Sequence, residues 1–156
     1  EGRYPKAGEG AKIMSLSDPE KKMSKSDENS NSVVYVLDSK DDILRKFKRA
    51  VTDSDTVVRY GEGKDGINNL MTIYSCFTGK TNEEIEREFD GKGYGDFKAA
   101  VGEAVVEHLR PIQERYADYS KNKDYLEQCY RASAEKALAI SLRTLRKVMK
   151  KIGYIL

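Results

Sequence analysis

Two lysines and two serines share one polar pentapeptide, Lys22-Met23-Ser24-Lys25-Ser26. Three residues of extended chain span at most about 10 Å, so the ammonium groups of Lys22 and Lys25 can straddle a polyphosphate. The hydroxyls of Ser24 and Ser26 add donors, and the backbone N–H groups of such a loop can form an anion nest. On residue types alone, a solvated loop without a ligand is the favoured interpretation. The chemistry of the pentapeptide also allows a phosphate-binding loop that closes on its ligand.

A second group of cations lies near the end of the chain. Residues 136–156 contain six Lys or Arg residues and no acid. The candidates for contact with RNA are Arg143, Arg146, Lys147 and Lys150. A basic run is typical of a phosphate-facing surface. The end of a helix also favours cations because of its dipole, so both interpretations stay open.

The remaining reactive residues do not form a recognisable catalytic or metal site. His108 is the only histidine, which argues against a His-based metal site or a Ser-His-Asp triad. We predict no metal site, and we interpret His108 as a packing or surface residue. Cys76 and Cys129 lie far apart without a C-x-x-C motif, which fits a reducing compartment. The glycines of Gly91–Gly95 lack the spacing of a dinucleotide fingerprint.

Length and composition limit the class of protein. The 156 residues correspond to about one domain. Charged residues make up 35% of the chain, against a typical value of about 25%. The sequence has neither a membrane-length apolar stretch nor an apolar segment near Glu1. We therefore expect a cytoplasmic protein without a signal peptide or a membrane partner.

The first 38 residues differ from the rest. Residues 12–16 form at most one short strand. Residues 17–32 contain a single apolar residue, Met23, so we expect a mobile loop that cannot bury itself. The β-branched and aromatic run at 33–37 predicts a short edge strand.

From Ser39 onward, apolar residues recur at helical spacing. Helix ends are marked by two capping boxes, a C-terminal glycine and a candidate N-cap: Ser39 with Asp42, Thr81 with Glu84, Gly79 and Asn122. Two long apolar stripes follow, over 97–119 and 126–152. The sequence therefore predicts a mainly α fold, a helical bundle with a short irregular or β N-terminal segment.

Lys-Met-Ser-Lys-Ser is the second signature of class I aminoacyl-tRNA synthetases, and its surroundings resemble the bacterial tryptophanyl-tRNA synthetases. The similarity runs in order from about residue 3 to residue 153. The matching blocks are Gly10–Leu16, Lys22–Asn29, Ala50–Asp55, Asn69–Tyr74, Gly91–Gly95 and Arg110–Tyr116. A match of five residues is weak evidence, whereas six blocks in register are specific.

The resemblance implies that the chain is the C-terminal part of such an enzyme. Residues 1–38 would be a remnant of the catalytic domain with a mobile lysine loop, and residues 39–156 a helical anticodon-binding domain. The sequence lacks the family's Rossmann-type α/β half, which carries a His-x-Gly-His type signature, the tryptophan pocket and most of the dimer interface. The resemblance therefore implies a homodimeric parent enzyme and a fragment that is inactive alone.

The resemblance also implies the chemistry. The family activates tryptophan with ATP and transfers it to tRNA(Trp), and Mg²⁺ accompanies the ATP phosphates. Lys25 and Lys22 would be catalytic, because they match the lysines that stabilise the leaving pyrophosphate. The implied ATP-binding residues are Ile13, Lys22, Met23, Ser24, Lys25 and Ser26.

Two alternatives remain at this stage. The chain is a stand-alone helical RNA-binding module that kept the loop without catalytic activity, or it is a structural bundle whose pentapeptide is coincidental. The other matching blocks argue against the coincidence. A nucleotide-binding half encoded before Glu1 in the natural gene would argue against the stand-alone module.

Overall fold

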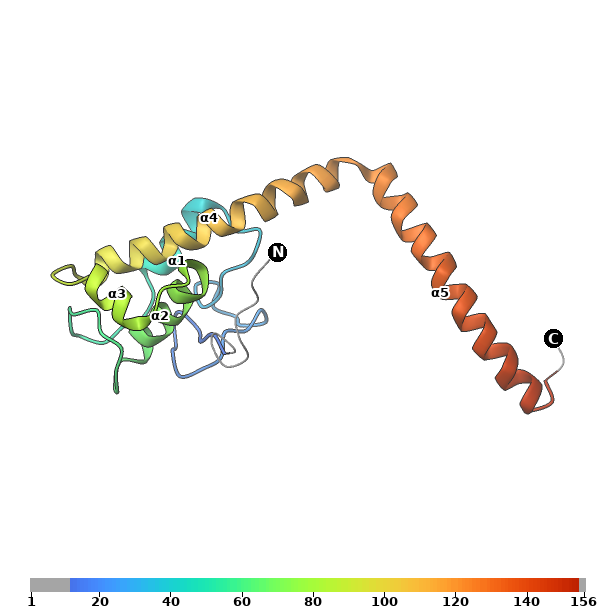
Figure 1. Cartoon of the computed structure of the whole chain (residues 1–156), viewed down its shortest axis with the longest axis horizontal. Coiled ribbons are helices and arrows are strands. Elements are labelled where there is room, and N and C mark those ends of the chain that lie inside the picture. The colour runs from blue at the N-terminus through green and yellow to red at the C-terminus, as the bar shows by residue number, and fades with distance from the viewer. Residues whose placement is uncertain (1–11, 155–156) are drawn as a thin grey trace. The chain divides into compact units, whose positions relative to one another are not determined.

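The computed structural model describes residues 12–154. Five helices lie in this range (Figure 1): α1 (Lys40–Lys48), α2 (Asp65–Thr78), α3 (Asn82–Glu88), α4 (Tyr94–Lys121) and α5 (Lys123–Lys151). The predicted mainly α fold is confirmed. The chain divides into two compact units, Glu1–Gln113 and Glu114–Leu156, so the division falls within α4. The functional boundary between residues 38 and 39 stays a prediction, and it coincides with the start of helical structure.

The helix caps explain where the helices begin and end. The hydroxyl of Ser39 accepts a hydrogen bond from the N–H of Asp42, and Thr81 and Glu84 form a complete capping box. Gly79 follows α2 with a left-handed φ of 73°, a conformation that glycine adopts without steric cost. The side chain of Asn122 accepts a hydrogen bond from the N–H of Tyr125 at the start of α5. The four predicted caps are therefore confirmed, but only Thr81 and Glu84 form the reciprocal bonds of a capping box.

The core of the first unit is built around α2. The rings of Tyr74, Phe89 and Phe97 meet edge to face, with centroids 4.9 to 5.9 Å apart, a geometry that aromatic quadrupoles favour. The largest fully buried apolar side chains are Phe47, Phe97, Leu16, Ile43, Ile67, Leu70, Met71, Ile85 and Val101. All four helices from α1 through α4, and the short segment around Leu16, contribute residues to this core.

The segment 33–37 forms no strand, so that prediction is wrong. The N–H of Tyr35 donates to the carboxylate of Asp38, and the N–H of Asp38 donates to the carbonyl of Tyr35. The amide of Gln113 in α4 donates to the carbonyls of Val36 and Asp38. These bonds fold the segment into a turn, because local and side-chain partners take the place of a neighbouring strand.

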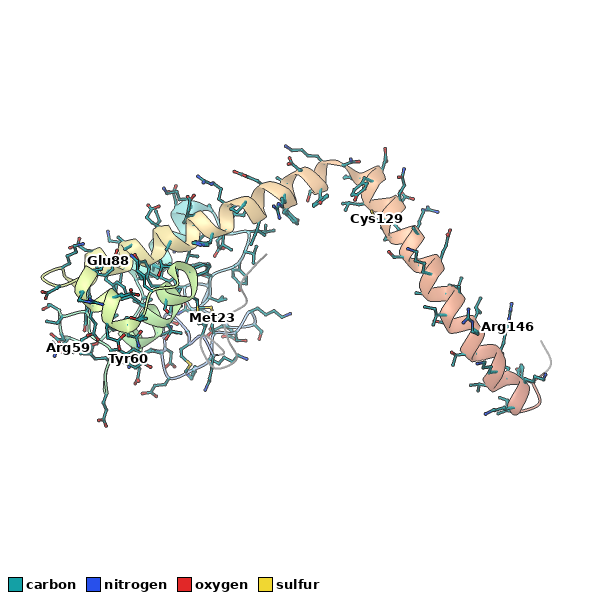
Figure 2. The ribbon with its side chains drawn as sticks, viewed as in Figure 1. Met23, Arg59, Tyr60, Glu88, Cys129 and Arg146 are labelled. Carbon is teal, nitrogen blue, oxygen red and sulfur yellow. The ribbon has the colours of Figure 1, made fainter. Side chains whose placement is uncertain are left out.

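Helix α5 has the predicted helical period but buries none of its residues. Leu138 is 57% exposed, and Leu145, Val148 and Ile152 are exposed as well. Figure 2 shows the side chains of α5 extending from the helix on its different sides. None of the helices described here is long and apolar enough to cross a membrane.

Gly66 lets α2 approach the chain that follows α1. A Cβ atom at residue 66 would lie 2.2 Å from the carbonyl oxygen of Val51 and 3.0 Å from the Cα of Thr52. Both neighbours are backbone atoms, so no side chain can rotate to relieve the overlap. The glycine is therefore required by close packing and not by an unusual φ.

We expect Gly66→Ala to lower the free energy of unfolding by about 1–3 kcal/mol, the usual cost of overpacking. Urea unfolding followed by circular dichroism measures the change. Gly95→Ala is the matched control, because a Cβ there would meet nothing within 4 Å and alanine favours the helix. Equal stability of the two variants would contradict the packing role of Gly66.

A network of polar side chains ties the loop after α1 to the start of α4. The hydroxyl of Tyr94 donates to Asp53 Oδ1 over 2.8 Å. The ammonium of Lys64 lies 2.7 Å from Asp55 Oδ2, 2.9 Å from the Tyr94 hydroxyl and 3.4 Å from Asp53 Oδ1. Burial disfavours the charge of Asp53, but the bonds from Tyr94, the Asp55 backbone and Lys64 outweigh it and lower its pKa. The hydrogen bond from Lys64 lowers the pKa of Asp55 to about 2.

This network predicts a specific loss of stability in acid. A carboxyl whose pKa is lower in the folded chain stabilises that chain above its unfolded pKa, here 3.8, and loses the effect as the pH falls through about 2. We expect Asp55→Asn to flatten the dependence of the urea midpoint on pH between about 4 and 2. Glu62→Gln, at an exposed residue of the same loop, is the control. If both variants keep the wild-type slope, the Asp55–Lys64 pair does not stabilise the fold.

Candidate functional site

The predicted phosphate-binding residues lie on one small hairpin, residues 12–32. Met14 pairs with Lys22 in an isolated antiparallel bridge. The N–H of Met23 donates to the carbonyl of Ile13 over 3.0 Å, and the N–H of Ser15 donates to the carbonyl of Lys21 over 2.8 Å. The strand predicted at 12–16 is thus reduced to one bridge, which forms the stem of the hairpin. Ile13 and Met23, both partly buried, pack against the core beneath it.

The stem is fixed to the rest of the first unit by backbone hydrogen bonds. The carbonyl of Leu16 accepts from the N–H of Val51 over 2.7 Å, and the N–H of Leu16 donates to the carbonyl of Ser32 over 3.0 Å. The side-chain amide of Asn69 in α2 bonds both backbone polar groups of Met14. These bonds therefore hold the first strand of the stem from the side opposite its second strand, residues 21–23 (the lysine strand).

The second strand of the stem, which contains Lys22, and the turn that follows it, which contains Lys25, present the cations to solvent. Lys22 and Lys25 are exposed, and within residues 12–154 neither makes a salt bridge. The hydroxyls of Ser24 and Ser26 lie 3.0 Å apart. The N–H of Asp27 donates to the carbonyl of Ser24, which closes a turn. Lys25 and the two serines thus lie on one exposed turn that directly follows the stem residues Lys22 and Met23.

The neighbouring lysine, Lys21, forms a salt bridge. The ammonium of Lys21 lies 2.8 Å from Asp18 Oδ2, and both groups are exposed. The hydrogen bond from Lys21 lowers the pKa of Asp18, and the same bond raises the pKa of Lys21. Lys21 is therefore exposed but paired, whereas Lys22 and Lys25 make no salt bridge within the described residues.

Sequence reasoning missed two residues that support the hairpin. Asn69 is 6% exposed on an otherwise apolar face of α2, and the hydroxyl of Tyr35 donates to the carbonyl of Lys25 over 3.1 Å. A polar residue among buried helix positions was the available signal for Asn69. No sequence signal pointed to Tyr35, since its contact depends on the turn at 33–38.

Several of the blocks quoted above are joined by hydrogen bonds. Asn69 of one block bonds Met14 of another, and Tyr94 bonds Asp53. Gln113 of the last block bonds the turn between the hairpin and α1. The blocks therefore correspond to contacts that hold the hairpin and its supports together.

The predicted RNA-binding cations lie on α5 and are all exposed. At 100° per residue, Arg143, Arg146, Lys147 and Lys150 share one face of the helix, and Leu138, Leu145 and Ile152 line the opposite face. Figure 2 labels Arg146 near the C-terminal end of α5. Within the described chain, none of the four cations pairs with an acid. Among those same residues, no cluster of three or more His, Cys, Asp or Glu side chains could hold a metal ion.

Comparison with known proteins identifies the family. The family described as "tRNA synthetases class I (W and Y)" matches residues 5–110. A tryptophan–tRNA ligase from Wolinella succinogenes is 51% identical over 94% of this chain and 44% of its own length. One from Clostridium perfringens is 47% identical over 99% of this chain and 46% of its own length. The chain thus spans less than half the length of these relatives.

A solved structure agrees with these sequence matches. The tryptophanyl-tRNA synthetase of Mycoplasma pneumoniae is 32% identical, with a TM-score of 0.70 over 91% of this chain and 43% of that one. The resemblance inferred from the motifs is therefore confirmed, and the chain belongs to the class I tRNA synthetases of the W and Y family.

Proposed function

We propose that the chain is the C-terminal part of a tryptophan–tRNA ligase and supplies its pyrophosphate-stabilising loop and its anticodon-binding helices. The observation that carries the proposal is the hairpin of residues 12–32. Its stem is fixed by backbone bonds, while Lys22 at the end of the stem and Lys25 on the turn that follows are both exposed. The two bacterial relatives, both named tryptophan–tRNA ligase, support tryptophan as the amino acid.

The proposed reaction uses the lysines as electrostatic catalysts. The carboxylate of tryptophan attacks the α-phosphate of ATP, the bond to the bridging oxygen breaks, and pyrophosphate leaves with the bond electrons. Negative charge grows on that oxygen and on the β-phosphate, so an ammonium placed there binds the transition state more tightly than ATP. We assign this role to Lys25 and, secondarily, to Lys22. The hydroxyls of Ser24 and Ser26 add hydrogen bonds to phosphate oxygens.

The stem would hold the nucleoside part of ATP. Ile13 and Met23 supply backbone groups to adenosine in this proposal. The carbonyl of Ile13 already accepts from the N–H of Met23, and a carbonyl oxygen keeps a second lone pair for a further donor. Mg²⁺ arrives with the ATP phosphates as part of the substrate, because triphosphate oxygens and water satisfy its preference for oxygen ligands.

The proposal includes motion of the loop. Residues 17–32 contain only one apolar side chain, and the contact between Ser24 and Ser26 on the turn after the stem is short-range. A segment with so few buried contacts opens at low cost. We propose that residues 1–38 belong to the catalytic domain and that this loop closes on ATP.

The remaining parts of the activity lie outside this chain in our proposal. The tryptophan pocket and most of the homodimer contact belong to a nucleotide-binding half, and the assembled enzyme works in the cytoplasm. The 156-residue chain alone would therefore form no tryptophanyl-adenylate.

The helical residues 39–156 would bind tRNA(Trp). The basic face of α5 supports this part, since Arg143, Arg146, Lys147 and Lys150 lie on one side of a helix without competing acids nearby. The same face supports a second candidate function, a stand-alone RNA-binding module without catalysis, because it is complete within this chain. Pyrophosphate exchange by the product of the whole natural gene separates the two candidates.

In the full-length ligase we expect Lys25→Ala to lower the rate constant of adenylate formation by about 10²–10³-fold, with a smaller effect on ATP affinity. Lys25→Arg should recover part of the rate, because a planar guanidinium does not replace a compact ammonium. Lys22→Ala should cost less. Single-turnover kinetics across an ATP titration measures the rate constant and the affinity separately.

Lys21→Ala is the matched control for Lys25→Ala. It removes the same charge from the same hairpin, but its ammonium is already paired with Asp18. We expect near wild-type kinetics for this variant. A Lys25→Ala enzyme with an unchanged rate constant and only a weaker ATP affinity would make Lys25 a uniform binding contact instead.

For RNA binding we expect the double variant Arg146→Ala, Lys147→Ala to weaken tRNA(Trp) binding and to reduce the slope of log affinity against log salt by about 1 per lost phosphate contact. Fluorescence anisotropy over a range of salt concentrations measures both. The double variant Lys123→Ala, Arg131→Ala removes the same charge from the first half of α5. Equal losses in the two double variants would assign the effect to net charge and not to the basic face.

A further inference from the structure

Asn69 is the polar exception on the buried face of α2. Its neighbours Ile67, Leu70 and Met71 are at most 1% exposed, and Asn69 itself is 6% exposed. A buried side-chain amide is costly unless its donors and acceptor are satisfied. Asn69 meets this requirement with one partner, because Oδ1 accepts from the N–H of Met14 over 2.8 Å and Nδ2 donates to the carbonyl of Met14 over 2.9 Å.

The hairpin geometry explains why Met14 is the residue that Asn69 bonds. In the antiparallel stem, the cross-strand bonds come from the residues on either side, Ile13 with Met23 and Ser15 with Lys21. Met14 and Lys22 therefore form the non-hydrogen-bonded pair, and Met14 turns its own N–H and carbonyl away from the lysine strand. The amide of Asn69 bonds this outer edge of Met14 as a neighbouring strand would.

This arrangement fixes the register of the stem. A shift of the stem by one residue would place the backbone of Ile13 or Ser15 opposite Asn69. The backbone polar groups of these two residues face residues 21–23 of the second strand instead. Each shift would leave the buried amide and a backbone group without partners. The bonds to Asn69 thus select one placement of Met14, and with it the placement of Lys22 and Met23 across the bridge.

We propose that Asn69 is a positioning residue for ATP activation, which sets the lysine hairpin on helix α2. The inference rests on the function proposed above for Lys22 and Lys25. Asn69 touches no reacting atom in this role. It acts through the stem, so its loss displaces the lysines from the leaving pyrophosphate while the other contacts of ATP and tryptophan remain.

The chain contains a matched control at the preceding residue. Asn68, also on α2, makes the same pair of bonds to a different loop: Oδ1 accepts from the N–H of Gly61 over 3.0 Å, and Nδ2 donates to the carbonyl of Gly61 over 2.7 Å. Asn→Asp keeps the shape and one acceptor at either residue but places a carboxylate oxygen against a carbonyl. Asn68→Asp and Asn69→Asp therefore make the same chemical change on α2 and differ in the loop they release, with Asn68 the less buried of the two.

The first measurement uses the 156-residue chain and needs no catalytic activity. In the wild type we expect slow hydrogen exchange at the N–H of Met14 and at the side-chain amide of Asn69. Asn69→Asp should speed exchange at Met14 and Met23 and speed tryptic cleavage after Lys22 and Lys25, whereas Asn68→Asp should not. Fast exchange at Met14 in the wild type would overturn the inference without any variant.

The second measurement uses the full-length enzyme. We expect Asn69→Asp to lower the rate constant of adenylate formation at saturating ATP by about 10²-fold, the scale of a misplacement of about 1 Å. Tryptophan affinity should stay unchanged, and Asn68→Asp should stay within about threefold of the wild type. Asn69→Leu, which fits the apolar face of α2, should reproduce the loss if Asn69→Asp fails to fold.

The outcomes separate this inference from the proposed function. An active wild type in which the Asn68 and Asn69 variants lose the same rate overturns the positioning role. A wild type without adenylate formation overturns the proposed function, and the exchange and cleavage measurements still decide whether Asn69 places the hairpin.

Discussion

The side-chain amide of one buried asparagine holds the hairpin of residues 12–32 against helix α2. Leu16 anchors the hairpin in the core, but residues 17–32 gain little from burial, because Met23 is the one apolar residue among them. Its place depends on bonds made by the stem: Met14 to Asn69, and Leu16 to Val51 and Ser32. These bonds, together with the packing of Leu16, Ile13 and Met23, set the position of Lys22 in the stem and of the turn that follows it.

The lysines of the first unit differ in whether their ammonium groups form ion pairs with carboxylates. Lys46 is 3% exposed, lies 2.5 Å from Asp38 and sits over the ring of Tyr35. Lys64 joins two aspartates and a tyrosine. Such cations are held in place by partners that neutralise them, and a phosphate would compete poorly for them. Lys22 and Lys25 differ from them, because both are exposed and neither makes a salt bridge within residues 12–154.

Local sequence signals predicted the helical part well, because capping and apolar period act over a few residues. Ser39 and Thr81 begin their helices and Gly79 ends α2, as predicted. The strand at 33–37 was wrong because strand formation needs a partner that local propensity does not reveal. The residues of the hairpin were found from their types and from the family resemblance. The contacts of Asn69 and Tyr35 and the Asp53–Tyr94 bond were not predicted from the sequence, because each joins segments distant in sequence.

Asn68 and Asn69 are neighbours in the chain, yet they hold backbones at Gly61 and Met14. Adjacent helical residues point about 100° apart. Helix α2 therefore makes hydrogen bonds to two different loops, at Gly61 and at Met14, on two of its sides. For protein engineering, the hairpin and α2 therefore form one exchangeable part. A chimera that takes residues 12–32 from one relative and α2 from another must match the amide at 69 to the incoming stem, and a cut between them divides a single structural unit.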